Sequence, residues 1–327
     1  MTLGVKGIIG VAHQNSFGTA PSVSSVMYLP FLSESIGLQI PPLYSNDFDG
    51  IIEEASEVEE GPRTIGGDLT LNAGPITLGQ LLKAGLGDPT TSIAGSSYQH
   101  VFVPRSGDFD IYSAQRPCAI MKSWAGVNTA ELMYNMALNT LEFSCAAGEL
   151  LKVKAGFVGG IQSYVAPPTV TYPAGRRVPW DVASIQVGSS TGIAARNNWR
   201  NFTITVDNAL EAKHNLANTQ YPARVERTGF RKITISGTMV FDDLLEYDAF
   251  LAQSERRLIV SFVSKDTIMT NTRNLMTLSI PSFRFKEFKK DTSGPGRIEA
   301  QFSGDAVYNS GSAHAFQFTL ANTYAAY

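Results

Sequence analysis

The feature that most constrains the fold of this 327-residue chain is a pattern that occurs twice along it. Residues 61–71 alternate apolar and polar side chains and lead directly into the apolar-rich stretch 76–82. Residues 229–241 alternate in the same way and lead into the stretch 244–251. Alternation with period two is typical of a strand, and apolar spacing of three or four is typical of a helix. Each half is therefore predicted to contain a strand followed at once by a short helix.

The end of each half repeats a second pattern. Residues 138–157 and residues 280–302 each predict two alternating strands joined by a glycine-centred turn, at Gly148 in the first half and at Gly294 and Gly296 in the second. The candidate first strands are residues 26–29 and 202–206. Both halves thus run in the order strands, short helix, strands, which predicts a duplicated unit.

The two helices have predictable ends. Asp242 or Asp243 is a natural N-cap for the second helix, and Gly85 and Gly87 are placed to end the first. The helices rest on apolar positions at the spacing of one helix face. These positions are Leu78, Leu81 and Leu82 in the first half, and Leu244, Tyr247 and Leu251 in the second.

Composition indicates a folded protein with a sparsely charged surface. Hydrophobic residues make up 43% of the chain, whereas charged residues make up only 17%, which is typical of a surface covered by neighbouring copies. Two cysteines, Cys118 and Cys145, are too few for a disulfide framework, and we expect both to be buried and inert. Neither a secretory start nor a run of eighteen apolar residues is visible, so we expect folding in a reducing cytosol and no membrane contact.

The net charge of −3 is distributed unevenly. Residues 1–165 carry −7 and residues 166–327 carry +4, so neither part is basic enough to predict nucleic-acid binding. Opposite charge favours attraction between unlike halves of neighbouring copies, although solvated faces explain it equally well. Closely spaced Pro and Gly residues in the segment 166–200 predict a linker or an extended arm. The predicted division is a first unit at 1–165, this linker, and a second unit at 201–327.

The stretch FRKITISGTMVFDDLLEYDAFL, residues 230–251, resembles the major tail proteins of long-tailed phages, the tail tube family. Residues 61–82 together with 141–158 resemble the same family. The resemblance implies an α+β, mainly β fold: two tandem tail-tube-like β-sandwich or barrel units, each with a short flanking helix. It implies a virion protein, assembled in the host cytoplasm into stacked rings that form a hollow tube lined by a closed β-barrel.

The resemblance also bears on partners. The usual ring of this family carries six units, so a chain with two units is expected to form a trimer with pseudo-sixfold symmetry; a hexamer stays open. Other tail proteins are expected partners, and genomic DNA is expected only as passing cargo. Rival interpretations are a distal tail, baseplate hub or terminator ring, a secretion-system or pyocin-like tube, and a carbohydrate-binding β-sandwich. The last would need an exposed aromatic platform, and the three tryptophans are dispersed.

An acidic segment is the candidate site for contacts between copies. Residues 47–60 hold seven carboxylates and no Lys or Arg, whereas the corresponding stretch of the second half is richer in basic residues. We hypothesise that the acidic segment meets this basic surface on an adjacent copy; a solvated loop is the alternative. The predicted contact residues are Asp47, Asp49, Glu53, Glu54, Glu57, Glu59, Glu60, Lys213, Arg224 and Arg227.

No motif for catalysis or cofactor binding is present. The four histidines are far apart, lack the spacing of metal ligands, and are expected to be surface or interface residues. The Asp47–Gly50 stretch lacks the Glu of a calcium loop, and neither a phosphate loop nor a nucleophile elbow occurs. Alternating phenylalanines in residues 283–302 predict buried sheet faces. We therefore expect no enzymatic activity, no cofactor and no metal.

Overall fold

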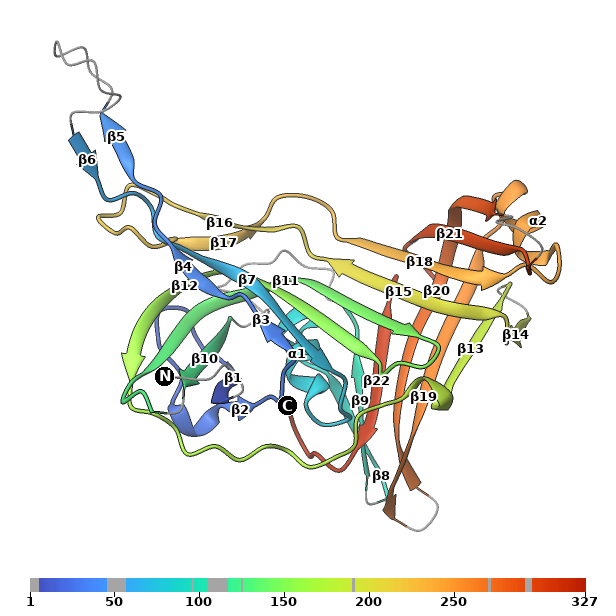
Figure 1. The fold of residues 1–327 in the computed structure, drawn as a ribbon, viewed down its shortest axis with the longest axis horizontal. Coiled ribbons are helices and arrows are strands. Elements are labelled where there is room, and N and C mark those ends of the chain that lie inside the picture. The colour runs from blue at the N-terminus through green and yellow to red at the C-terminus, as the bar shows by residue number, and fades with distance from the viewer. Residues whose placement is uncertain are drawn as a thin grey trace.

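The structure is a computed structural model that describes residues 6–45, 57–95, 97–104, 117–124, 126–189, 192–269, 272–291 and 296–327. These residues form a mainly β protein in which long antiparallel strands run through the body and two short helices lie against it (Figure 1). The predicted mainly β class is confirmed. No helix in the described ranges is long and apolar enough to cross a bilayer.

The described residues of the first half form thirteen elements besides a short 3-10 turn at Val23–Ser25. They are β1 (Gly7–His13), β2 (Met27–Tyr28), β3 (Ser33–Glu34), β4 (Gly37–Gln39), β5 (Leu43–Ser45), β6 (Glu57–Glu59), β7 (Thr64–Asn72), α1 (Leu78–Leu86), β8 (Thr90–Ala94), β9 (Ser97–Phe102), β10 (Cys118–Trp124), β11 (Ala130–Ala146) and β12 (Lys152–Val165).

The second half follows after a 3-10 turn at Trp180–Val182. It contains β13 (Ala183–Gly188), β14 (Ile193–Ala195), β15 (Trp199–Asp207), β16 (Leu210–Lys213), β17 (Arg224–Arg227), β18 (Lys232–Val240), α2 (Leu245–Leu251), β19 (Arg256–Met269), β20 (Thr272–Asp291), β21 (Glu299–Ala306) and β22 (Gln317–Asn322). The segment 166–200, predicted as a linker or arm, thus includes β13, β14 and the start of β15.

The same scheme of antiparallel pairing occurs in both halves. In the first, β1 pairs with β2 and β10, and the sheet continues through β11, β12 and β7 to β3 and β4. In the second, β13 pairs with β14 and β19, and the sheet continues through β20, β21 and β18 to β15. Each half also has a separate hairpin, β5–β6 or β16–β17. Even a bulge recurs, after Leu138 in β11 and after Phe285 in β20.

These pairings correct the expected first strands. Residues 26–29 contribute only the two-residue β2, which pairs with β1 as β14 pairs with β13. The place that β15 takes beside β18 is taken in the first half by β3 and β4, beside β7. The sequence did not predict this because β3 and β4 are short, and the whole of residues 33–39 contains only Ile36 and Leu38 as apolar residues.

The sheet of the single chain is open, so the expectation of barrel units is wrong for the isolated chain. In the part of the chain that the structure describes, β3 and β4 pair only with β7, and residues 284–291 of β20 pair only with β21. A closed barrel would leave neither edge unpaired.

A strand-to-strand junction joins the two halves. The C-terminal part of β11 pairs with β15 from Thr140 opposite Asp207 to Ala146 opposite Asn201. A second link runs through the β8–β9 hairpin, because β9 pairs with β22 and β22 pairs with β20. One apolar core spans both halves and includes Phe143, Phe202 and Phe318. The halves are therefore continuous parts of one body.

Tyr327 packs against α1. The ring of Tyr327 lies where a Cβ on Gly79 would be, so only glycine permits this contact. The Tyr327 hydroxyl donates to the Ile76 carbonyl at 2.9 Å, and the Lys83 ammonium donates to the Tyr327 carbonyl at 2.6 Å. At the end of α1, Gly87 has φ 104° and donates its N–H to Lys83, as predicted for a helix stop.

The two helices bury different kinds of face. Leu78, Leu81 and Leu82 of α1 are completely buried. On α2, by contrast, Leu244 and Leu251 are more than half exposed, and the buried residues are Glu246 and Ala249. The N-cap of α2 is Leu244, not Asp242 or Asp243, and it makes no side-chain cap hydrogen bond. Asp243, just before it, accepts the Leu245 N–H at 3.0 Å.

Candidate assembly surface

The described part of the acidic segment, residues 57–60, lies on and just after one strand of a hairpin that projects from the body. Figure 1 shows β5 and β6 extending away from the sheet at the end of the molecule opposite α2. The side chains of Glu57 and Glu59 on β6 are exposed. Four of the predicted contact residues, Asp47, Asp49, Glu53 and Glu54, lie outside the described residues.

The base of this hairpin is held by the second half of the same chain. The Glu60 carboxylate accepts hydrogen bonds from Gln220 and from Arg63, each at 3.1 Å, and these bonds lower the pKa of Glu60. The Arg63 N–H donates to the Gln220 carbonyl at 2.8 Å, and the Arg63 guanidinium lies 5.6 Å from the ring centre of Tyr221. Glu60 thus fixes the position of the hairpin within its own chain.

The predicted basic residues lie on the β16–β17 hairpin and have partners within their own chain. Lys213 lies 2.8 Å from Glu211, and Arg224 lies 2.5 Å from Glu226. Arg227 donates to the backbone carbonyl of Asn208 at 2.8 Å. The structure therefore brings Glu60 close to the connection between β16 and β17, and leaves Glu57 and Glu59 on the projecting hairpin.

Two unpaired sheet edges were not predicted as sites. Residues 284–291 of β20 and residues 33–39 each have one partner strand among the described residues. Part of the second edge is occupied by side chains, because the Ile36 N–H donates to the Glu34 carboxylate at 3.0 Å and its carbonyl accepts from the Lys122 ammonium at 2.6 Å. Exposed edges of this kind are the usual templates for pairing with another chain.

His100 corrects the expectation for the histidines. It is completely buried where the β8–β9 hairpin meets the C-terminal segment, with Nδ1 2.9 Å from the Thr91 hydroxyl and Nε2 2.8 Å from the Tyr324 carbonyl. Because Nε2 faces a carbonyl, it carries the proton, and Nδ1 accepts from the hydroxyl. Burial lowers the pKa of His100. Its role is therefore to link the two halves.

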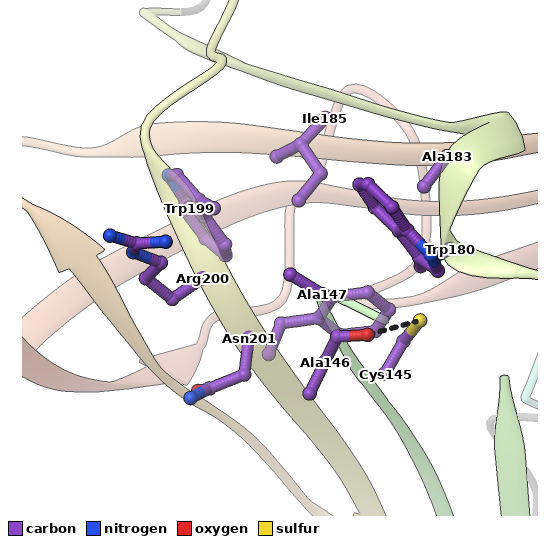
Figure 2. Close-up of a pocket in the computed structure, with 10 residues that line it drawn as sticks. Cys145, Ala146, Ala147, Trp180, Ala183, Ile185, Trp199, Arg200 and Asn201 are labelled. Carbon is purple, nitrogen blue, oxygen red and sulfur yellow. Dashed lines mark hydrogen bonds between the residues drawn. The ribbon is translucent and has the colours of Figure 1, made fainter. Parts of the chain in front are cut away.

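A small cavity lies at the junction between the halves (Figure 2). It measures about 100 Å³ and is bounded by the end of β11, the start of β15 and the two aromatic side chains Trp180 and Trp199. Ligand pockets usually measure roughly 300–1,000 Å³, so this space is a packing gap. Burial raises the pKa of Cys145, which borders it, to about 11, and raises that of Cys118 to about 12. Both thiols are thus held protonated.

Across the described ranges, no three His, Cys, Asp or Glu side chains gather as a metal site would require. The geometry instead offers surfaces: two unpaired edges, a projecting acidic hairpin and an internal junction between similar halves. A family model described as phage tail tube protein matches residues 4–306. The chain belongs to the phage tail tube protein family. The comparison with curated proteins found no match.

As a member of the tail tube family, the chain is a structural protein of the phage tail. The tail tube assignment agrees with the resemblance carried by residues 230–251, which fold into β18 and α2 as predicted. Sequence reasoning named the acidic segment as a candidate contact surface, which stays a prediction, and it named neither edge. The signal that could have found the β20 edge is its run of exposed polar residues, Lys286, Glu287, Lys289, Lys290 and Asp291.

Proposed function

We propose that the chain polymerises into stacked rings that form the hollow tail tube through which phage DNA passes. The observation that supports this most is the β11–β15 junction, in which one half extends the sheet of the other. If the halves are copies of one unit, the free outer ends of the same sheet can be joined by the same kind of contact between chains. Repetition of one contact around an axis produces a closed ring.

The proposed ring contains three chains. Each chain supplies two halves with the same pairing scheme, so three chains provide the six units that the family's usual ring would carry. Ring closure also satisfies the open edges of the single chain, which would otherwise favour aggregation. A hexamer of this chain would place twelve halves in one ring.

The projecting acidic hairpin is proposed to contact an adjacent copy. Glu57 and Glu59 are exposed on β6, away from the local pairs that hold Lys213 and Arg224. Exposed ion pairs each contribute only about 0–1 kcal/mol, so the hairpin would set register and specificity more than strength. DNA would be cargo, and fast passage requires that the inner wall form few phosphate contacts.

Negative-stain microscopy of the purified full-length protein tests the proposed function. The expected result is rings or hollow filaments of uniform diameter. Monodisperse monomers under all conditions of salt and concentration would contradict it. Copy number in purified virions separates a tube from a distal, hub or terminator ring, because a tube protein is present in many copies and the others in few.

A further inference from the structure

The proposed contact between chains can be specified residue by residue, because the β11–β15 junction within one chain serves as the template for it. The inference rests on the proposed function and deepens it. We propose that residues 284–291 of β20 take as their partner strand residues 33–39 of the next copy, antiparallel, with Glu287 opposite Gln39 and Asp291 opposite Ser35 of that copy.

The register follows from a comparison of the two halves. In each half, the residues paired on successive strands are traced from the first paired residue after the bulge. In the first half, successive cross-strand neighbours are Thr140, Gly156, Asp68 and Ser35. In the second half, they are Glu287, Ser303, Ser236 and Thr203. Ser35 therefore occupies in the first half the place that Thr203 occupies in the second.

The internal junction then supplies the pairing. Thr203 lies opposite Ser144, which is four residues after Thr140, and the residue four after Glu287 is Asp291. Asp291 is thus matched with Ser35 of the next copy. In the same way, the pair of Thr140 and Asp207 is matched by Glu287 and Gln39.

The backbone groups on the free strand point in the required direction. At the internal junction, the Arg200 carbonyl accepts from Ala147 at 2.9 Å and the Asn208 N–H donates to Asn139 at 2.8 Å, so even-numbered residues of this segment face β11. On the free strand, the Ser35 N–H donates to Asp68 on β7. Ile36, the counterpart of Ile204, therefore faces outward.

A side-chain bridge marks the two sites as equivalent. At the internal junction, the Asn208 amide donates to the Gly85 carbonyl in α1 at 3.0 Å and to the Leu138 carbonyl at 3.1 Å. At the free edge, the matching carbonyls are Phe250 in α2 and Phe285, and Gln253 donates to them at 2.9 and 3.5 Å.

The bridging amide thus comes from the end of the paired strand at the internal junction, but from the receiving chain at the free edge. A strand from another copy would require this change. Asn208 follows β15, and the residue that follows β4 is Ile40. Ile40 has no side-chain amide and is 40% exposed. The next copy could not supply the bridging amide, and Gln253 of the receiving chain supplies it instead. On the incoming strand, the Glu34 carboxylate would leave the Ile36 N–H, whereas the Ile36 carbonyl can keep Lys122 and accept a second hydrogen bond.

Disulfide trapping in assembled tubes tests the register. The variants Gln39→Cys/Glu287→Cys and Ser35→Cys/Asp291→Cys each place two cysteines at predicted opposite positions, which lie close enough to bridge. The crossed variants Ser35→Cys/Glu287→Cys and Gln39→Cys/Asp291→Cys use the same four substitutions but place the thiols four residues out of register, about 13 Å along the strand. All four side chains are exposed.

The predicted result after mild oxidation is covalent dimers and trimers for the in-register variants, with no species above the trimer, and monomers for the crossed variants. Ser35 accepts the Asp68 N–H at 3.0 Å, so the Gln39 pair is the milder change. Tubes that cross-link equally in both sets, or in neither, would overturn the register while leaving the proposed function intact. Absence of tubes for the unmodified chain would overturn both.

Discussion

At the scale of single residues, Glu246 illustrates how the second helix differs from its sequence pattern. Its carboxylate is buried beneath α2, 2.6 Å from the Arg256 guanidinium and 3.0 Å from that of Arg196. The leucines that define the apolar pattern remain exposed. The spacing of apolar residues alone could not predict this. It identifies a helix, but it does not show that an arginine on a neighbouring strand will pair with a glutamate and so bury the face that carries it.

Substitution of Glu246 by Ala should lower the free energy of unfolding by about 3–5 kcal/mol, because it leaves buried guanidinium charge without a partner. Denaturant unfolding measures this change. Glu255→Ala is the matched control, since its pair with Arg284 is half exposed on both sides and should contribute about 0–1 kcal/mol. Equal losses in the two variants would contradict the role of the buried pair.

His100 makes the link between the halves sensitive to acid. Its pKa is lowered in the folded chain, so protonation favours the unfolded form, and its contribution to stability is present above the ordinary value of 6.5 and lost as pH falls below it. The melting temperature should therefore decrease as the pH is lowered from about 8 to about 5. His100→Gln should reduce this dependence, and an unchanged pH profile in that variant would show that other groups cause it.

At the scale of elements, the strand–helix units and the β11–β12 and β20–β21 hairpins could be predicted because each has clear alternation or a glycine turn. The edge strands could not. Ile36 and Leu38 are the only apolar residues of residues 33–39, and a strand held by β7 on one side needs little alternation of its own. The acidic hairpin was predicted as a contact surface, and its exposed Glu57 and Glu59 keep that prediction open to test.

Charge change on β6 tests the hairpin. Reversal by Glu57→Lys/Glu59→Lys should slow tube elongation, and neutralisation by Glu57→Gln/Glu59→Gln should slow it less, if the contact is electrostatic. Added salt should reduce the difference between the variants and the unmodified chain. Elongation followed by light scattering provides the measurement. Identical rates for all three proteins at low salt would assign the hairpin no role in assembly.

A proline at Lys290 tests the free edge of β20. By equivalence with Phe143 on β11, the Lys290 N–H faces the free edge, so Lys290→Pro should leave the monomer folded but prevent tube formation. The Lys290 ammonium also lies 3.4 Å from the ring centre of Tyr247, and Lys290→Ala removes that contact while keeping the N–H. The alanine variant should assemble. Tubes formed by the proline variant would show that this edge is not used.

At the scale of the whole molecule, the repeat pattern predicted two similar halves but not how they join. The β11–β15 junction depends on strands about sixty residues apart, and no local pattern encodes that distance. The barrel expectation was wrong for one chain because, among the described residues, its sheet ends at two open edges, residues 284–291 of β20 and residues 33–39. The two open edges lie at opposite ends of one sheet, so one edge of a chain can pair with the other edge of the next chain.

The most direct test is a cryo-electron microscopy reconstruction of the assembled tube that resolves individual strands. The account predicts three chains in each ring, with residues 33–39 of one chain beside residues 284–291 of the next and a junction that matches β11–β15 within each chain. A ring of six chains, or a chain interface built on other strands, would contradict it.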